Sequence, residues 1–150
     1  MYVSNRNSVN IELSFSTIHG KAAERALIDS GATDNFIDQR TAKRLHLTPR
    51  QLKQPRLLYN VDGTENLSGR VTSYCDLLIT RGKDESVQRF FLANLGKDRI
   101  ILGFPWLHHF NPQIDWSKGG VTGTPFHVAV TSRSTPETPK NLLHYAQILG

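Results

Sequence analysis

The chain has 150 residues and a net charge of +5, from 18 Lys and Arg against 13 Asp and Glu. This length suits one domain, which buries roughly 68–70% of the surface that its unfolded chain exposes, and leaves no room for a second full domain. No apolar run approaches the roughly 20 residues that span a bilayer, and no secretory signal is visible, so we expect a soluble, cytoplasmic protein.

Strands dominate the pattern from residue 9 onward. Period-two alternation or short apolar runs predict strands at residues 9–15, 22–28, 57–61, 64 onward, 71–80, 87–92 and 100–102. Turn signals separate them: His19-Gly20, then Asp62-Gly63, a pair suited to a two-residue hairpin turn, then a polar turn at residues 81–84. Long helical periodicity is absent, so a mainly β fold follows.

Two short helices are expected between these strands. Asp38 can cap a helix that runs through Leu45, because its carboxylate accepts the free N–H groups of the first turn, and Pro49 is expected to stop it. Residues 104–107 suit the start of a second helix, with a proline in the first turn and Asn111-Pro112 closing the segment. From residue 131 the composition shifts to Ser, Thr and Pro, which predicts a domain at 1–130 and a linker or tail at 131–150.

Several features favour unremarkable roles. The densest basic group, Arg40, Lys43 and Arg44, lacks the interleaved aromatic residues of a stacking platform, so we interpret it as a solvated helix face and expect no nucleic acid partner. The lone Cys75 has no second cysteine for a disulfide or zinc cluster and is expected to be a small strand residue. The histidines, including the adjacent His108-His109, lack ligand spacing, so no metal or cofactor is expected.

The most informative stretch is Ala26 to Ala32, in which an apolar run delivers Asp29 into a turn that contains Ser30 and Gly31. A catalytic carboxylate can be placed in this way, at the point where a strand enters a turn. Taken alone, the tripeptide also suits an ordinary turn in which the aspartate binds nearby N–H groups. A serine hydrolase would need Gly-x-Ser-x-Gly spacing, which this segment lacks.

Two further motifs follow in order, Ile100-Ile101-Leu102-Gly103 and then residues 111–116. From Val9 to Trp116 the chain resembles the retropepsin-like aspartic proteases of gypsy-type long-terminal-repeat retrotransposons, or a domesticated derivative of one. The resemblance implies a mainly β, closed barrel-like subunit, with one short helix after the second apolar-Gly motif, that works as a homodimer.

The chemistry explains the second subunit. Metal-free peptide hydrolysis can use two adjacent carboxyls that share one proton, as is established for aspartic proteases as a class. Each of the other aspartates lacks a following Ser-Gly or Thr-Gly: Asp34, Asp38, Asp62, Asp76, Asp84, Asp98 and Asp115. One chain therefore supplies half a dyad, and two-fold symmetry would bring Asp29 beside its own copy. We expect an aspartic endopeptidase whose substrate is a Gag-Pol-type polyprotein.

The resemblance also implies individual roles. The Ser30 hydroxyl would bond across the dimer axis, Gly31 would let the substrate backbone approach, and the tip of the 57–64 hairpin would form a flap. Substrate-binding positions are expected at Leu27, Ala32, Val61, Asp62, Gly63 and Ile101. Gly103 would lie tucked behind the aspartate loop. Thr33 and Phe104 stand where viral relatives often have an Asp–Arg pair, so subunit contacts can differ here.

Other interpretations stay open at this level. The rival to an enzyme is a non-catalytic binding or assembly module that keeps the fold. Asp115 is interpreted as a structural hydrogen-bond acceptor. Trp106 and Trp116 have apolar surroundings that favour the core or the subunit interface over ligand stacking.

Overall fold

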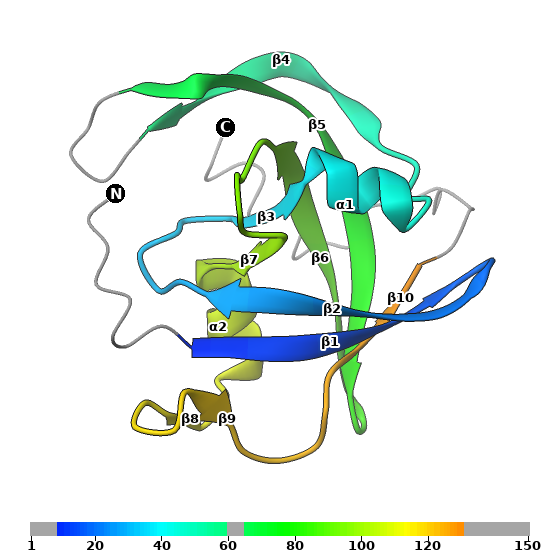
Figure 1. The fold of residues 1–150 in the computed structure, drawn as a ribbon, viewed down its shortest axis with the longest axis vertical. Helices are drawn as coiled ribbons and strands as arrows, with labels where there is room; N and C mark the ends of the chain where they lie inside the picture. The colour runs from blue at the N-terminus through cyan, green and yellow to red at the C-terminus, as the bar shows by residue number, and fades with distance from the viewer. Residues whose placement is uncertain (1–8, 60–64, 131–150) are drawn as a thin grey trace.

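The computed structural model describes residues 9–59 and 65–130 (Figure 1). In chain order the elements are β1 (Val9–Thr17), β2 (Gly20–Ile28), β3 (Asn35–Asp38), α1 (Gln39–Arg44), β4 (Arg50–Tyr59), β5 (Glu65–Arg81), β6 (Asp84–Ala93), β7 (Ile100–Leu102), α2 (Phe104–Phe110), β8 (Ile114–Asp115), β9 (Gly120–Val121) and β10 (His127–Ala129). The predicted turn at Asp62-Gly63 and the predicted tail at 131–150 lie outside the described residues.

Eight of the described strands form one closed sheet, and β8 and β9 pair separately as a two-stranded sheet. The order of the closed sheet is β10-β1-β2-β7-β3-β6-β5-β4, and β10 also pairs with β5, which joins the two sides of the sheet into a barrel. β10 runs parallel to β1 from Ser14↔His127 and antiparallel to β5 from His127↔Thr80. The expected closed, barrel-like fold is confirmed, although the sequence pattern had not indicated the strand that closes it.

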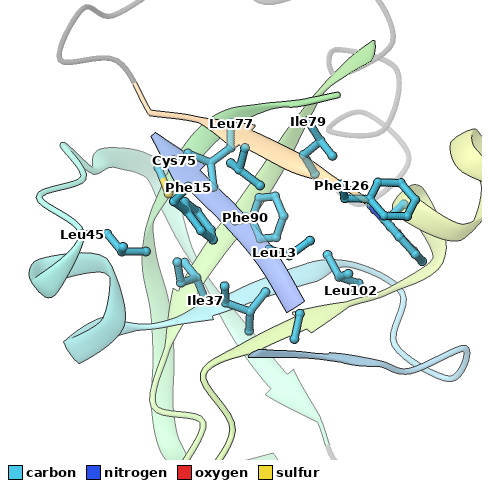
Figure 2. Close-up of a cluster of buried hydrophobic side chains, with 14 of the residues drawn as sticks. Leu13, Phe15, Ile37, Leu45, Cys75, Leu77, Ile79, Phe90, Leu102 and Phe126 are labelled. Carbon is cyan, nitrogen blue, oxygen red and sulfur yellow. The ribbon is translucent and has the colours of Figure 1, made fainter. Parts of the chain in front are cut away.

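Within the barrel, alternation decides which side chains face inward. On β1 the side chains of Val9, Leu13 and Phe15 are fully buried, and β2 returns antiparallel from Thr17↔Gly20 to Val9↔Ile28. Figure 2 shows apolar side chains of several strands gathered in the main hydrophobic cluster. Cys75 belongs to that core, as expected of a small strand residue, and burial raises the pKa of its thiol to about 12.

Aromatic rings fill one end of the core. The Trp106 ring is fully buried, with its centroid 5.0 Å from that of Phe126 and 6.0 Å from that of Phe110. Phe126 directly precedes β10, so these rings anchor the strand that closes the barrel. Trp106 is thus a core residue, whereas Trp116 is half exposed and does not belong to the core.

Both predicted helices are present. The Asp38 carboxylate caps α1, because its Oδ2 accepts the Arg40 N–H at 3.1 Å. The prediction that Pro49 stops this helix is wrong: α1 ends at Arg44, and His46 takes a positive φ of 58° well before the proline. α2 has its proline in the first turn and is capped at its C-terminus by Asn111, whose φ is 40°. Among the described residues, no helix has the length and apolar character needed to cross a bilayer.

Arg40, Lys43 and Arg44 are exposed, as expected of a solvated helix face, and Arg44 also pairs with a buried carboxylate. Arg44 Nη2 lies 2.6 Å from Oε1 of Glu24, and Arg99 Nη1 lies 3.1 Å from the other oxygen of the same carboxylate. Glu24 is only 4% exposed. A buried carboxylate is costly without partners, so these two arginines account for its position on β2.

The hairpin expected to act as a flap forms its two arms. β4 and β5 pair antiparallel as far as Tyr59↔Glu65, and they arch over one side of the molecule in Figure 1. β4 starts at Arg50, earlier than the apolar run had indicated. Pro55 is tolerated because β4 is the outermost strand of the sheet and the pairing shifts register between Gln51 and Arg56.

Candidate active site

Asp29 sits where β2 leaves the sheet. Its N–H donates to the Leu102 carbonyl at 3.0 Å, which continues the parallel pairing of β2 with β7 one residue beyond Ile28↔Leu102. The Gly31 N–H donates to Asp29 Oδ1 at 2.9 Å, and the Ala32 N–H donates to the Asp29 carbonyl at 3.1 Å. This tight turn holds a half-buried carboxyl at the end of the strand, beside the exposed residues Ser30 and Gly31.

The junction between β7 and α2 braces that turn from behind. The Phe104 N–H donates to the Ala32 carbonyl at 2.9 Å. A Cβ on Gly103 would overlap the Asp34 carbonyl oxygen and lie 2.7 Å from that of Ala32, so only glycine fits between the two segments. The expectation that Gly103 is tucked behind the aspartate loop is therefore confirmed.

Apolar side chains form a row next to Asp29. Leu27 pairs with Ile101, and Ile101 pairs with Phe36, so the three lie side by side across β2, β7 and β3. All three are half buried, whereas their chain neighbours are buried in the barrel, so the row faces the other side of the sheet. The structure thus brings together Leu27 and Ile101, two of the predicted substrate-binding residues.

The other predicted binding residues have different outcomes. Ala32 is half buried, and its carbonyl is occupied by the Phe104 N–H. Val61, Asp62 and Gly63, expected at the flap tip, lie outside the described residues.

A cavity of about 400 Å³ opens beside the row. The aspartate loop and the strands β3, β4, β5 and β6 all contribute to its walls, which are Thr33, Asp34, Phe36, Arg56, Leu57, Leu58, Val71 and Phe91. Sequence reasoning missed most of these residues. The β3–β6 register, which pairs Phe36 with Phe91, is what brings them together.

Asp34 is the acidic group of this cavity. Its Oδ2 accepts the Thr33 hydroxyl at 3.0 Å, while its Oδ1 is buried without a hydrogen-bond partner. Burial raises the pKa of Asp34, and the Thr33 hydrogen bond and the Arg56 charge partly oppose that rise. The Arg56 guanidinium itself lies 5.3 Å from the centroid of the Phe91 ring. The cavity therefore has mainly apolar walls and one carboxyl group, whose Oδ1 is buried without a hydrogen-bond partner.

Thr33 and Phe104, which stand where viral relatives often have an Asp–Arg pair, form no ion pair. The Phe104 side chain is 51% exposed, and its ring lies 5.4 Å from that of His108 in a stacked arrangement. Thr33 bonds to its neighbour Asp34 instead of to the helix. Neither Thr33 nor Phe104 carries a charge, so this departure from the viral pattern leaves no buried charge without a partner.

Other candidate residues are engaged elsewhere. Asp115 Oδ1 accepts the Ser117 hydroxyl at 2.6 Å and the N–H groups of Ser117 and Lys118 at 3.1 Å, which confirms its structural role. These bonds lower the pKa of Asp115, the Ser117 hydroxyl most of all. His109 Nε2 lies 2.9 Å from Asp84 Oδ1. Across residues 9–59 and 65–130, no three His, Cys, Asp or Glu side chains gather as a metal site would require.

A barrel that presents an Asp-Ser-Gly turn, braced by an apolar-Gly strand, defines a retropepsin-like subunit. The chain belongs to the PEG10/RTL1 protease domain family, whose model matches residues 25–129. It is accordingly a gypsy-type, retrotransposon-derived, retropepsin-like protease domain or a domesticated derivative of one.

The fold is shared with a solved structure of another protein. A retropepsin-like aspartic protease from Rickettsia conorii superimposes with a TM-score of 0.50 at 20% sequence identity, over 75% of this chain and 88% of that one. The retroviral protease-like domain of Ddi1 from Leishmania major gives a TM-score of 0.45 at 18% identity, over 84% of this chain and 92% of its own.

Proposed function

We propose that this chain is an aspartic endopeptidase that acts as a symmetric homodimer. The observation that carries the proposal is the Asp29 turn, which three hydrogen bonds hold at the end of β2 and the β7–α2 junction supports from behind. The described chain has one such turn, so a complete dyad needs a second subunit. A two-fold axis that passes beside Asp29 would supply it.

In the proposed reaction, the two copies of Asp29 share one proton. The ionised carboxylate takes a proton from water as the water oxygen attacks the scissile carbonyl carbon, and the protonated carboxyl gives its proton to the carbonyl oxygen. Collapse of the tetrahedral intermediate breaks the C–N bond, with a proton passed to the leaving amine. Activity should be highest at acidic to mildly acidic pH, where the pair keeps one proton.

The substrate would be an extended polypeptide. The row of Leu27, Ile101 and Phe36 offers an apolar floor beside Asp29, and the cavity next to it is large enough for a side chain. The β4–β5 hairpin would cover the peptide from the other side. A Gag-Pol-type polyprotein, processed in the cytoplasm or within virus-like particles, is the proposed natural substrate.

Asp29→Asn tests the mechanism, with Asp84→Asn as the matched control. The control makes the same chemical change at an exposed turn and removes only a surface contact with His109. Cleavage of a peptide library should be lost in Asp29→Asn and kept in the control, while both variants sediment like the wild type. A statine-type transition-state analogue should inhibit the wild type.

Two results would refute the proposal. One is cleavage that survives in a folded Asp29→Asn protein. The other is a wild-type protein that stays monomeric at working concentration and cleaves nothing, which would support the non-catalytic binding or assembly module instead.

A further inference from the structure

Two buried side-chain amides connect β3 and β6 to the β7–α2 junction, which lies behind the aspartate loop. Asn35 on β3 is fully buried, and Gln88 on β6 is 2% exposed. The Gly103 N–H donates to Asn35 Oδ1 at 2.9 Å, Asn35 Nδ2 donates to Gln88 Oε1 at 2.8 Å, and Gln88 Nε2 donates to the Pro105 carbonyl at 3.2 Å. This chain of bonds, here called the amide relay, begins and ends on the junction behind Asp29.

The direction of the amide relay is set by its ends. A backbone N–H can only donate and a carbonyl can only accept. Gly103 therefore requires the oxygen of Asn35, which turns the Asn35 NH₂ toward Gln88, and Pro105 requires the NH₂ of Gln88. Secondary bonds to the Arg89 carbonyl at 3.4 Å and the Ser86 hydroxyl at 3.2 Å fit the same orientation. Replacing the side-chain amide nitrogen of Asn35 or of Gln88 by oxygen would leave two hydrogen-bond acceptors facing each other.

The relay reaches the catalytic carboxyl through the backbone. It holds residues 103 and 105, and the residue between them, Phe104, donates to the Ala32 carbonyl. Ala32 in turn closes the turn on the Asp29 carbonyl, and Asp29 donates to Leu102, directly before Gly103. A shift of the junction would therefore move Asp29. Reactions that depend on positioned groups lose about 10²-fold in rate for a displacement of about 1 Å.

We propose that Asn35 and Gln88 are positioning residues for Asp29, because the amide relay sets where the aspartate loop stands relative to the dimer axis. This inference rests on the proposed function. A merely structural role, in which two buried amides only satisfy each other, predicts a loss of stability with no change in turnover by the molecules that remain folded.

Asn35→Asp is the decisive variant. With its carboxyl ionised, it keeps the volume and the acceptor for Gly103 but loses the donor to Gln88, so kcat is compared at the alkaline end of the active pH range. We expect kcat per active site, with sites counted by titration with the statine-type inhibitor, to fall up to about 10²-fold while KM stays roughly unchanged. Asn94→Asp is the control, since it makes the same change at an exposed turn and keeps the acceptor for the Gly96 N–H.

A rescue variant tests the direction of the relay. In Asn35→Asp combined with Gln88→Lys, the lysine ammonium can donate both to the new carboxylate and to the Pro105 carbonyl, so the donor–acceptor order is restored. Most of the lost kcat should return. If Asn35→Asp does not fold, Gln88→Glu asks the same question, because it keeps the acceptor for Asn35 and loses the donor to Pro105.

Amide hydrogen exchange gives a readout that needs no catalysis. Exchange at the Asp29 and Phe104 amides should be faster in Asn35→Asp than in the wild type, and unchanged in Asn94→Asp. Unchanged kcat per titrated site, failure of the rescue, or unaltered exchange at these two amides would each overturn the proposal. If the wild type cleaves nothing but exchange at both amides responds, the proposed function fails while the positioning role stands.

Discussion

Gly103→Ala should displace the aspartate loop. The new methyl carbon would overlap the Asp34 carbonyl oxygen and lie 2.7 Å from that of Ala32. Ordinary carbon–oxygen contacts are about 3.3–3.6 Å, so the Ala32 carbonyl must retreat by roughly 0.6–0.9 Å. Such a movement would stretch the Phe104–Ala32 hydrogen bond, which is 2.9 Å long.

The energetic cost follows from the tight packing on both sides. Inserting one methyl group into a packed site costs about 1–3 kcal/mol, which for a domain of this size lowers Tm by roughly 3–10 °C. The displacement of Asp29 should lower kcat by about one to two orders of magnitude beyond any loss of folded protein. Urea unfolding and peptide cleavage per titrated active site measure the two effects separately.

Gly120→Ala is the matched control. Gly120 has nothing within 4 Å of the added carbon, so both stability and activity should stay near the wild-type values. If Gly103→Ala matched Gly120→Ala in both assays, the close packing of the junction against the aspartate loop would not be what positions Asp29.

Three further predictions concern stability. Phe126→Ala removes a ring packed against Trp106, Phe110 and the Arg81 guanidinium. It should lower the free energy of unfolding, measured in urea, by about 3–5 kcal/mol, because β10 loses the packing that holds it in place. A loss below about 1 kcal/mol would refute that role. Burial raises the pKa of Asp34 above its unfolded value, so the folded state retains a proton at a pH where the unfolded state has lost it. The free energy of unfolding therefore falls as pH rises from the unfolded-state pKa to the folded-state pKa. Asp34→Asn, which does not titrate, should therefore gain stability relative to the wild type as pH rises above the ordinary aspartate pKa of 3.8, whereas a pH-independent difference would contradict this. Arg44→Met should destabilise the fold by about 1–3 kcal/mol, because it removes one of two partners of the buried Glu24, and should have much less effect in a Glu24→Gln background; equal costs in both backgrounds would count against the pairing.

Local sequence chemistry predicted most elements because their signals lie within a few residues. The alternation from Val9 predicted β1, the apolar triplet Ile100–Leu102 matched β7, and the Asp38 carboxylate predicted the start of α1. The end of α1 was predicted less well. Pro49 looked decisive, but the left-handed backbone of His46 had already turned the chain.

Motif order predicted the aspartate turn and the glycine behind it, since the resemblance rests on residue types at fixed places in the chain. It did not indicate the cavity, the ion pairs of Glu24 or the amide relay. Asn35 and Gln88 are 53 residues apart, and neither carries a local signal. The parallel pairing of β3 with β6 sets Asn35 opposite Phe90 and so within hydrogen-bonding reach of Gln88, and pairing partners are not encoded in any short window.

By itself, the sequence determined the alternation that makes strands, the single Asp-Ser-Gly turn and the fold family, because each depends on residue type and short spacing. Tertiary structure alone decided which strand closes the barrel, which carboxylates are buried and which side chains support the Gly103 junction behind Asp29. These features depend on long-range contacts, in which segments distant in the chain compete for the same hydrogen-bonding and packing partners. The closed sheet is the arrangement that satisfies most of these contacts at once.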